Sequence, residues 1–302
     1  MTIVDLLAIV ARQIPARLRI PSSLHWNKTS YLLLSGFLAV VGLIIAVWWP
    51  LASEYLGMID PRYPVWVQLD WLLIGIFAAM SLLIMGGADL RKDARIILVG
   101  LAGGLTIEAW GTQTLLWTYY TSERPPLWII PAWPIASLAI DRLYRLARPL
   151  FRRLPARGTD ALFGIIFISF YLLMLWYVWP TAGKPFTVVA LLLCALLILS
   201  PGDRKIALLM FLAGSGLGYF LELWGTTREC WIYYTRETPP LFAVFAHGMA
   251  AMAFWRAGEL LRWIVLPRVR QVAAGLRPAK PAGSALPEPG TAAAGRSESS
   301  SH

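Results

Sequence analysis

The sequence predicts an all-α polytopic membrane protein with about eight transmembrane helices, arranged as two tandem, parallel four-helix repeats. Hydrophobic residues make up 58% of the 302-residue chain, charged residues make up 15%, and the mean hydropathy is +0.60. A soluble chain of this length is far less apolar, so a membrane is the solvent that fits. In addition, the motif Glu-x-Trp-Gly-Thr occurs twice at an offset of 114 residues (222 − 108), which indicates an internal duplication.

Hydrophobic runs of about 20 residues recur along the chain, and each is long enough to cross a hydrocarbon core of roughly 30 Å. An even number of such spans places both ends of the chain on one side of the membrane. The eight expected spans cover residues 31–49, 65–85, 96–119, 127–146, 160–179, 185–199, 206–233 and 241–265.

The basic residues lie in the connections at alternate ends of these spans. They precede the first span, occur within residues 91–95, and are dense in residues 142–157. Cytoplasmic connections carry such an excess of Lys and Arg, so we expect a multi-pass protein of a bacterial-type inner (cytoplasmic) membrane with both termini in the cytoplasm. The net charge of +10 then reflects topology, and no nucleic-acid partner is expected.

These patterns divide the chain into five parts. Residues 1–30 form a cytoplasmic or interfacial segment. The membrane repeats cover residues 31–146 and 159–266, and a basic cytoplasmic linker, residues 147–158, joins them. Residues 267–302 start as a basic segment and continue as a tail rich in Pro, Ala, Gly and Ser, for which disorder is expected.

The duplicated segment covers residues 104–127 and 218–241. Its copies read GLTIEAWGTQTLLWTYYTSERPPL and GYFLELWGTTRECWIYYTRETPPL, and they align without a gap. Since each unit contains an even number of spans, both copies enter the membrane in the same orientation, related by an axis along the membrane normal. The third and seventh spans are therefore expected to be partners.

Glu108 and Glu222 are the candidate catalytic residues, because both lie well inside a predicted span. An intramembrane carboxyl costs several kcal/mol unless it is neutral, paired or next to a cavity, and such acids commonly serve a function. If the two meet across the repeat axis, one can donate a proton while the other stabilises positive charge. The alternative is that each carboxyl only forms hydrogen bonds that specify packing.

Candidate substrate-binding residues share the helical stripe of each acid. Thr112 follows Glu108 by four residues and Tyr119 by eleven, while Gly111 leaves space beside the carboxyl. The second copy repeats the stripe with Gly225, Thr226 and Tyr233.

The motif tryptophans are expected to be structural. Trp110 and Trp117 lie seven residues apart and, on a continuous helix, point away from Glu108 toward a neighbouring helix. Trp224 and Trp231 occupy the matching positions.

His247 is a third candidate catalytic residue, as a proton shuttle. The repeat places Trp133 at the matching position (247 − 133 = 114), so the histidine breaks the symmetry. A packing role for His247 is the alternative.

Other polar residues carry weaker indications. Asp70 and Lys184 match across the repeat and are candidates for an ion pair, whereas Asp141 and Arg142 fit positive-inside topology alone. The sequence has no phosphate-binding loop and no metal-ligand spacing, so neither a metal nor a cofactor is expected. The two cysteines, Cys194 and Cys230, are expected to be packing residues.

The string Glu108-Ala-Trp-Gly-Thr, followed by Tyr119-Tyr120-Thr121, Pro126-Leu127 and Pro131, resembles the carotenoid-hydratase family of bacterioruberin-type pathways. That family's pattern also joins Glu-x-x-Gly-Thr to Tyr-x-Tyr and later prolines. The resemblance covers about 25 residues per copy and lacks the family's glycine-rich middle. It implies acid-catalysed addition of water to the terminal alkene of a carotenoid, with Glu108 or Glu222 as proton donor.

Three functions follow as hypotheses. The first is a cofactor-free membrane enzyme that acts on an isoprenoid, carotenoid-like or other polyene lipid through acid chemistry. The second is a proton-coupled transporter, which the tandem repeats and intramembrane acids also fit. The third is a non-catalytic subunit that packs pigments or a membrane-protein partner through a surface rich in the chain's 15 tryptophans.

Overall fold

The computed structural model describes residues 21–47, 49–127, 129–151, 155–200, 202–265 and 267. The chain divides into two compact units, Met1–Leu260 and Leu261–His302. Most of the predicted N-terminal segment and nearly all of the predicted tail lie outside the described residues.

Helices dominate the described residues, as the sequence predicts. The α-helices are α2 (Lys28–Val47), α3 (Trp49–Gly57), α4 (Trp71–Met85), α5 (Leu90–Thr114), α6 (Ala132–Phe151), α7 (Ala156–Val178), α8 (Pro185–Leu199), α9 (Arg204–Thr227) and α10 (Leu241–Leu260). Short helical turns are η2 (Ser22–Leu24), η3 (Val65–Val67), η4 (Trp179–Thr181) and the π-helical η5 (Leu261–Val265). Strands β1 (Trp117–Tyr119) and β2 (Trp231–Tyr233) form a two-stranded sheet.

The length and composition of these helices fit a membrane protein. Among the described residues, four helices are long and apolar enough to cross a membrane: Leu90–Thr114, Arg157–Thr181, Arg204–Thr227 and Leu241–Trp263. Trp71–Met85 and Pro185–Leu199 are apolar but shorter. Helix α6 is as long as a span, but it carries Asp141, Arg142, Arg145 and Arg148.

Aspartates cap the N-termini of the two helices that carry the motif. The carboxylate of Asp89 accepts hydrogen bonds from the backbone N–H groups of Arg91 and Lys92 at the start of α5. Asp203 caps α9 in the same way. An aspartate at this position satisfies N–H groups that have no partner inside the helix.

The prediction of continuous helices through residues 119 and 233 is wrong. Helix α5 ends at Thr114, because Leu115 adopts a left-handed conformation with φ of 63° and the N–H of Leu116 donates to the carbonyl of Gly111. The chain then enters β1. Helix α9 ends at Thr227, and β2 follows it.

The two strands pair antiparallel and bring the ends of α5 and α9 together. Trp117 lies opposite Tyr233, and Tyr119 lies opposite Trp231. The two matching segments of the duplication therefore pair with each other in one small sheet.

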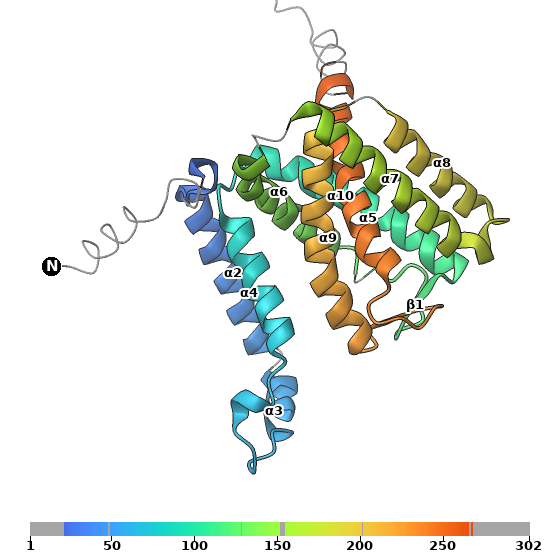
Figure 1. Ribbon diagram of the computed structural model, residues 1–302. Coiled ribbons are helices and arrows are strands. Elements are labelled where there is room, and N and C mark those ends of the chain that lie inside the picture. Colours follow the sequence, from blue (N-terminus) through green and yellow to red (C-terminus); the bar gives the residue numbers. More distant parts are fainter. Residues whose placement is uncertain are drawn as a thin grey trace, which may run out of the picture. The chain divides into compact units, whose positions relative to one another are not determined.

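Helices α9 and α10 pack along each other, α5 packs against α6, and contacts of α5 with α10 and of α6 with α9 complete the central group (Figure 1). Helices α7 and α8 contact each other and this group, and α2 lies beside α4. The largest cluster of buried apolar side chains joins α7, α9 and α10, with Phe167, Tyr177, Leu208 and Met252 almost fully buried.

Charged side chains pair where helices meet. Arg142 on α6 is fully buried and donates to Asp93 on α5 at 2.6 Å and to Asp141 at 2.8 Å. Lys92 and Arg145 also contact Asp141. Positive-inside topology alone is therefore an insufficient explanation of Arg142, which joins α5 to α6.

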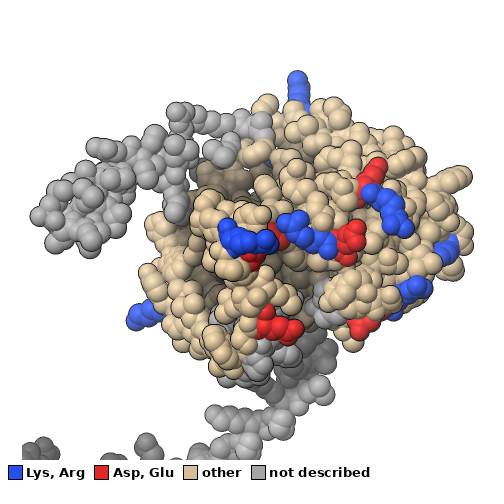
Figure 2. Space-filling view, turned by 90° about the horizontal axis from the view of Figure 1, so that it is seen from below, with Lys and Arg blue, Asp and Glu red and all other residues tan. Residues whose placement is uncertain are grey.

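The predicted pair of Asp70 with Lys184 does not form. Asp70 instead contacts Arg228 at 3.1 Å, and Lys184 donates to the carbonyl of Thr114. Figure 2 shows one face of the molecule, on which uncharged residues predominate and basic and acidic side chains lie beside one another.

Replacing Arg142 with methionine should lower the free energy of unfolding by about 3–5 kcal/mol, because it leaves the buried carboxylate of Asp93 without its cation and removes one of the three cations around Asp141. The thermal midpoint of the purified chain in detergent measures the effect. Arg204→Met is the control, since the Arg204–Asp160 pair is exposed and worth about 1 kcal/mol or less. Equal losses in the two variants would contradict the role given to Arg142.

Candidate functional site

Glu108, on α5, has a buried carboxyl that accepts three hydrogen bonds. The side chain is 3% exposed. Its Oε1 accepts from the hydroxyl of Tyr119 at 2.9 Å and from the indole N–H of Trp133 at 3.1 Å. Its Oε2 accepts from the indole N–H of Trp117 at 3.0 Å. The buried carboxyl is thus supplied with donors from two elements, the strand β1 that follows α5 and the helix α6.

Glu222, on α9, has the same environment with one exchange. It is also 3% exposed. Tyr233 and Trp231 donate to its two oxygens at 2.8 Å each. The third position is taken by His247, whose Nε2 lies 2.8 Å from Oε1. Histidine, unlike the Trp133 indole, can both bind and release a proton at this atom.

The turn after each motif helix returns the aromatic side chains to the acid. Gly111 is required for this, because a Cβ at that position would overlap the indole ring of Trp117. Gly225 lies beneath Trp231 in the same way. The glycines thus make room for an indole rather than for a ligand.

The two acid environments touch through their aromatic rings. The centroids of Trp117 and Tyr233 are 5.9 Å apart, and those of Tyr119 and Trp231 are 6.0 Å apart. Trp133 and His247 stack with centroids 5.6 Å apart and planes inclined by 20°. Each acid is therefore linked to the other through the rings that donate to it.

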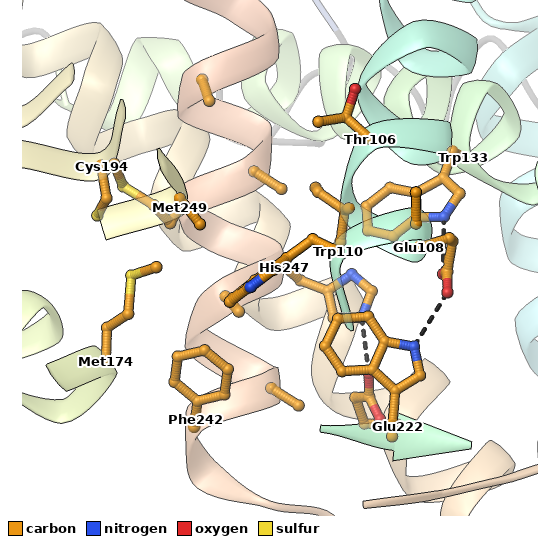
Figure 3. A pocket seen from close by; sticks show the side chains of 18 of the residues that line it. Thr106, Glu108, Trp110, Trp133, Met174, Cys194, Glu222, Phe242, His247 and Met249 are labelled. Carbon is orange, nitrogen blue, oxygen red and sulfur yellow. Dashed lines mark hydrogen bonds and ion pairs between the residues drawn. The ribbon is translucent and has the colours of Figure 1, made fainter. Parts of the chain in front are cut away.

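Both acids line one cavity of about 490 Å³. Figure 3 shows Glu108 beside Trp133, together with His247 and Glu222. In this view Met174 and Cys194 lie on the opposite side of the cavity. The remaining wall is mainly apolar and aromatic and includes Trp110, Phe170, Phe186, Val189, Leu193, Trp224 and Phe242. The cavity thus combines a hydrocarbon-like wall with two carboxyls.

The candidate substrate-binding residues separate into two groups. Tyr119 and Tyr233 line the cavity, although Tyr119 reaches Glu108 through a strand and not through the predicted helical stripe. Thr112 and Thr226 lie outside the lining, since each hydroxyl donates to the backbone carbonyl of the motif glutamate at 2.5 Å.

The structure also changes the placement of the motif tryptophans. Trp117 and Trp231 were expected to point away from the acids, and that expectation is wrong, because both donate directly to them. Trp110 and Trp224 do bond to neighbouring elements, through Thr187 at 3.2 Å and Asp70 at 3.0 Å. All four rings nevertheless line the cavity.

Sequence reasoning missed Trp133 as a member of the site. The signal was present, because Trp133 is the residue that matches His247 across the duplication. Within the described ranges, no group of three or more His, Cys, Asp or Glu side chains is placed to hold a metal ion. Cys194 is a buried free thiol on the cavity wall.

Comparison of the chain with protein-family models, with curated proteins and with solved structures gives no match.

Gly225→Ala should destabilise the chain by about 1–3 kcal/mol, because the added methyl group displaces the Trp231 ring from Glu222. Gly216→Ala, on the same helix, has open space around the added group and should be neutral or slightly stabilising. The thermal midpoints of the two variants provide the comparison. If Gly225→Ala is as stable as Gly216→Ala, the close packing of indole on glycine is not required.

Proposed function

We propose that this chain is an integral membrane enzyme that acts on an isoprenoid- or carotenoid-like lipid by acid chemistry. One observation carries the proposal: a single, mainly apolar cavity has two buried carboxyls on its wall, and one of them contacts a histidine. The resemblance to carotenoid hydratases at the Glu108 motif supports the same reaction class.

The cavity wall favours a hydrocarbon substrate. A volume of about 490 Å³ lies within the range of small-ligand sites. Of the described residues that line it, none is Lys or Arg, so a phosphate or carboxylate group would meet two acidic side chains and no Lys or Arg partner. The terminal segment of a polyene fits this environment, and the remainder of the chain would leave along α8.

The two acids take different roles in the proposed reaction. Glu222, with His247 as its proton source, transfers a proton to one alkene carbon, and the π electron pair forms the new C–H bond. The carbocation that results on the other carbon is stabilised by the Glu108 carboxylate and by aromatic ring faces. The Trp133 indole donates a hydrogen bond but does not act as an acid or base, which suits Glu108 to the electrostatic role.

The carbocation can react in two ways, and each gives a balanced reaction. Water can attack the carbocation, form a C–O bond and release a proton to a carboxylate, which gives an alcohol. Alternatively, a neighbouring carbon can lose a proton, which shifts the double bond and consumes no second reactant. The resemblance favours the first outcome.

We further propose eight spans, built as two parallel repeats in a bacterial-type inner membrane with both termini in the cytoplasm. Matching contacts support the repeats. Asp89 and Asp203 cap matching helices, and Glu108 and Glu222 accept from matching donors. The distribution of basic residues supports the orientation.

The reaction is tested with the purified chain and candidate polyenes in D2O, where protonation leaves one deuterium on carbon. Wild-type protein should label the substrate, and Glu222→Gln should label it at least about 100-fold more slowly. His247→Trp keeps an N–H donor but removes a ring nitrogen that can act as an acid or base, and should also slow labelling. Asp160→Asn, an exposed acid outside the cavity, is the control. Full activity in both Glu108→Gln and Glu222→Gln would rule out the mechanism.

A proton-coupled carrier is the second candidate, because a pair of acids with a histidine can also load and release protons. Flux of protons or of a lipophilic solute into liposomes distinguishes it from an enzyme. Glu222-dependent flux without any change in the solute would replace the enzyme proposal. Co-purification of an unaltered pigment or membrane protein would instead favour a non-catalytic subunit.

A further inference from the structure

We infer that the cavity binds a lipophilic organic cation, such as an alkylammonium, with its charged group beside Glu108 and Glu222 and its chain along α8. This inference goes beyond the proposed reaction. It concerns equilibrium binding, and it holds whether or not any alkene is protonated.

Charge on the cavity wall is the first argument. The ionisable carboxyls and imidazole on the wall are those of Glu108, Glu222 and His247, and the described lining contains no Lys or Arg. The nearby basic residues are engaged elsewhere: Lys184 bonds the carbonyl of Thr114, and Arg228 pairs with Asp70. Two carboxylates therefore face at most one positive charge, and a buried negative charge favours a cationic partner.

The aromatic rings supply the second argument. The N–H edges of Trp117, Trp133 and Trp231 are turned toward carboxyl oxygens. The ring faces carry the negative part of the aromatic quadrupole, and cages of such faces are a known means of binding quaternary ammonium groups. The aromatic residues on the cavity wall can thus add to the attraction of the carboxyls for a cation.

Helix α8 indicates where the lipophilic part of the ligand would lie. Phe186, Val189 and Leu193 on α8 line the cavity, yet they are 57%, 51% and 49% exposed. The cavity thus reaches the molecular surface between apolar side chains. An alkyl chain can follow this route while its charged end stays beside the acids.

Other ligand classes fit less well. A small hydrated cation would lose water to a wall that is mostly hydrocarbon. An anion would meet two acidic side chains, and a neutral lipid supplies a positive charge only after it has been protonated. A hydrophobic ammonium ion would place its alkyl groups against the apolar wall and its positive charge beside the acids.

The test uses the full-length chain in uncharged maltoside micelles and radiolabelled hexyltrimethylammonium, with protein-free micelles as the baseline. We expect saturable binding to the wild-type chain. The neutral isostere 2,2-dimethyloctane, in which carbon replaces the nitrogen, should compete at least about tenfold more weakly. Hexanesulfonate should not compete.

Variants then locate the cation. The double variant Glu108→Gln/Glu222→Gln should lose at least about tenfold in affinity, whereas Asp160→Asn should bind as the wild type does. If the double variant fails to fold, the comparison of cation with isostere in the wild-type chain still decides. Equal competition by the neutral isostere, or the lack of saturable binding, would overturn the inference. Neither result would bear on deuterium labelling of a polyene, so the two proposals fail separately.

Discussion

The structure of this chain depends on the burial of two carboxyl groups. A carboxyl in an apolar interior is costly unless its oxygens accept hydrogen bonds. Each motif glutamate meets this requirement with three partners, which come from its own downstream strand and from the next long helix. The need to donate hydrogen bonds to each carboxyl therefore determines where its helix ends, how the chain turns back, and where the following helix lies.

The short sheet is a consequence of the same requirement. Trp117 and Tyr119 must both reach Glu108, and an extended segment lets alternate residues point to one side. The matching segment at Trp231 and Tyr233 has the same need. Their antiparallel pairing satisfies the backbone groups of both segments and brings the two acid environments into ring contact.

The sequence could predict the helical class, the two acids and their tyrosines, because composition and a gap-free duplication are visible in it. It could not predict the hydrogen bond from Trp117 to Glu108. That bond depends on the left-handed conformation of Leu115, at a position where the sequence has neither glycine nor proline to indicate a turn. Arg142 was misread for a related reason: its partner Asp93 lies 49 residues away in the sequence, and burial decides between a topology signal and an ion pair.

The exchange of Trp133 for His247 distinguishes the environments of two otherwise matching acids. Both side chains place a ring nitrogen near Oε1 of their glutamate, and the two rings stack on each other. The histidine therefore preserves the shape of the site while adding a nitrogen that can gain or lose a proton. In the proposed reaction, a duplication alone would give two equivalent carboxyls, whereas this one substitution assigns proton transfer to Glu222 and charge stabilisation to Glu108.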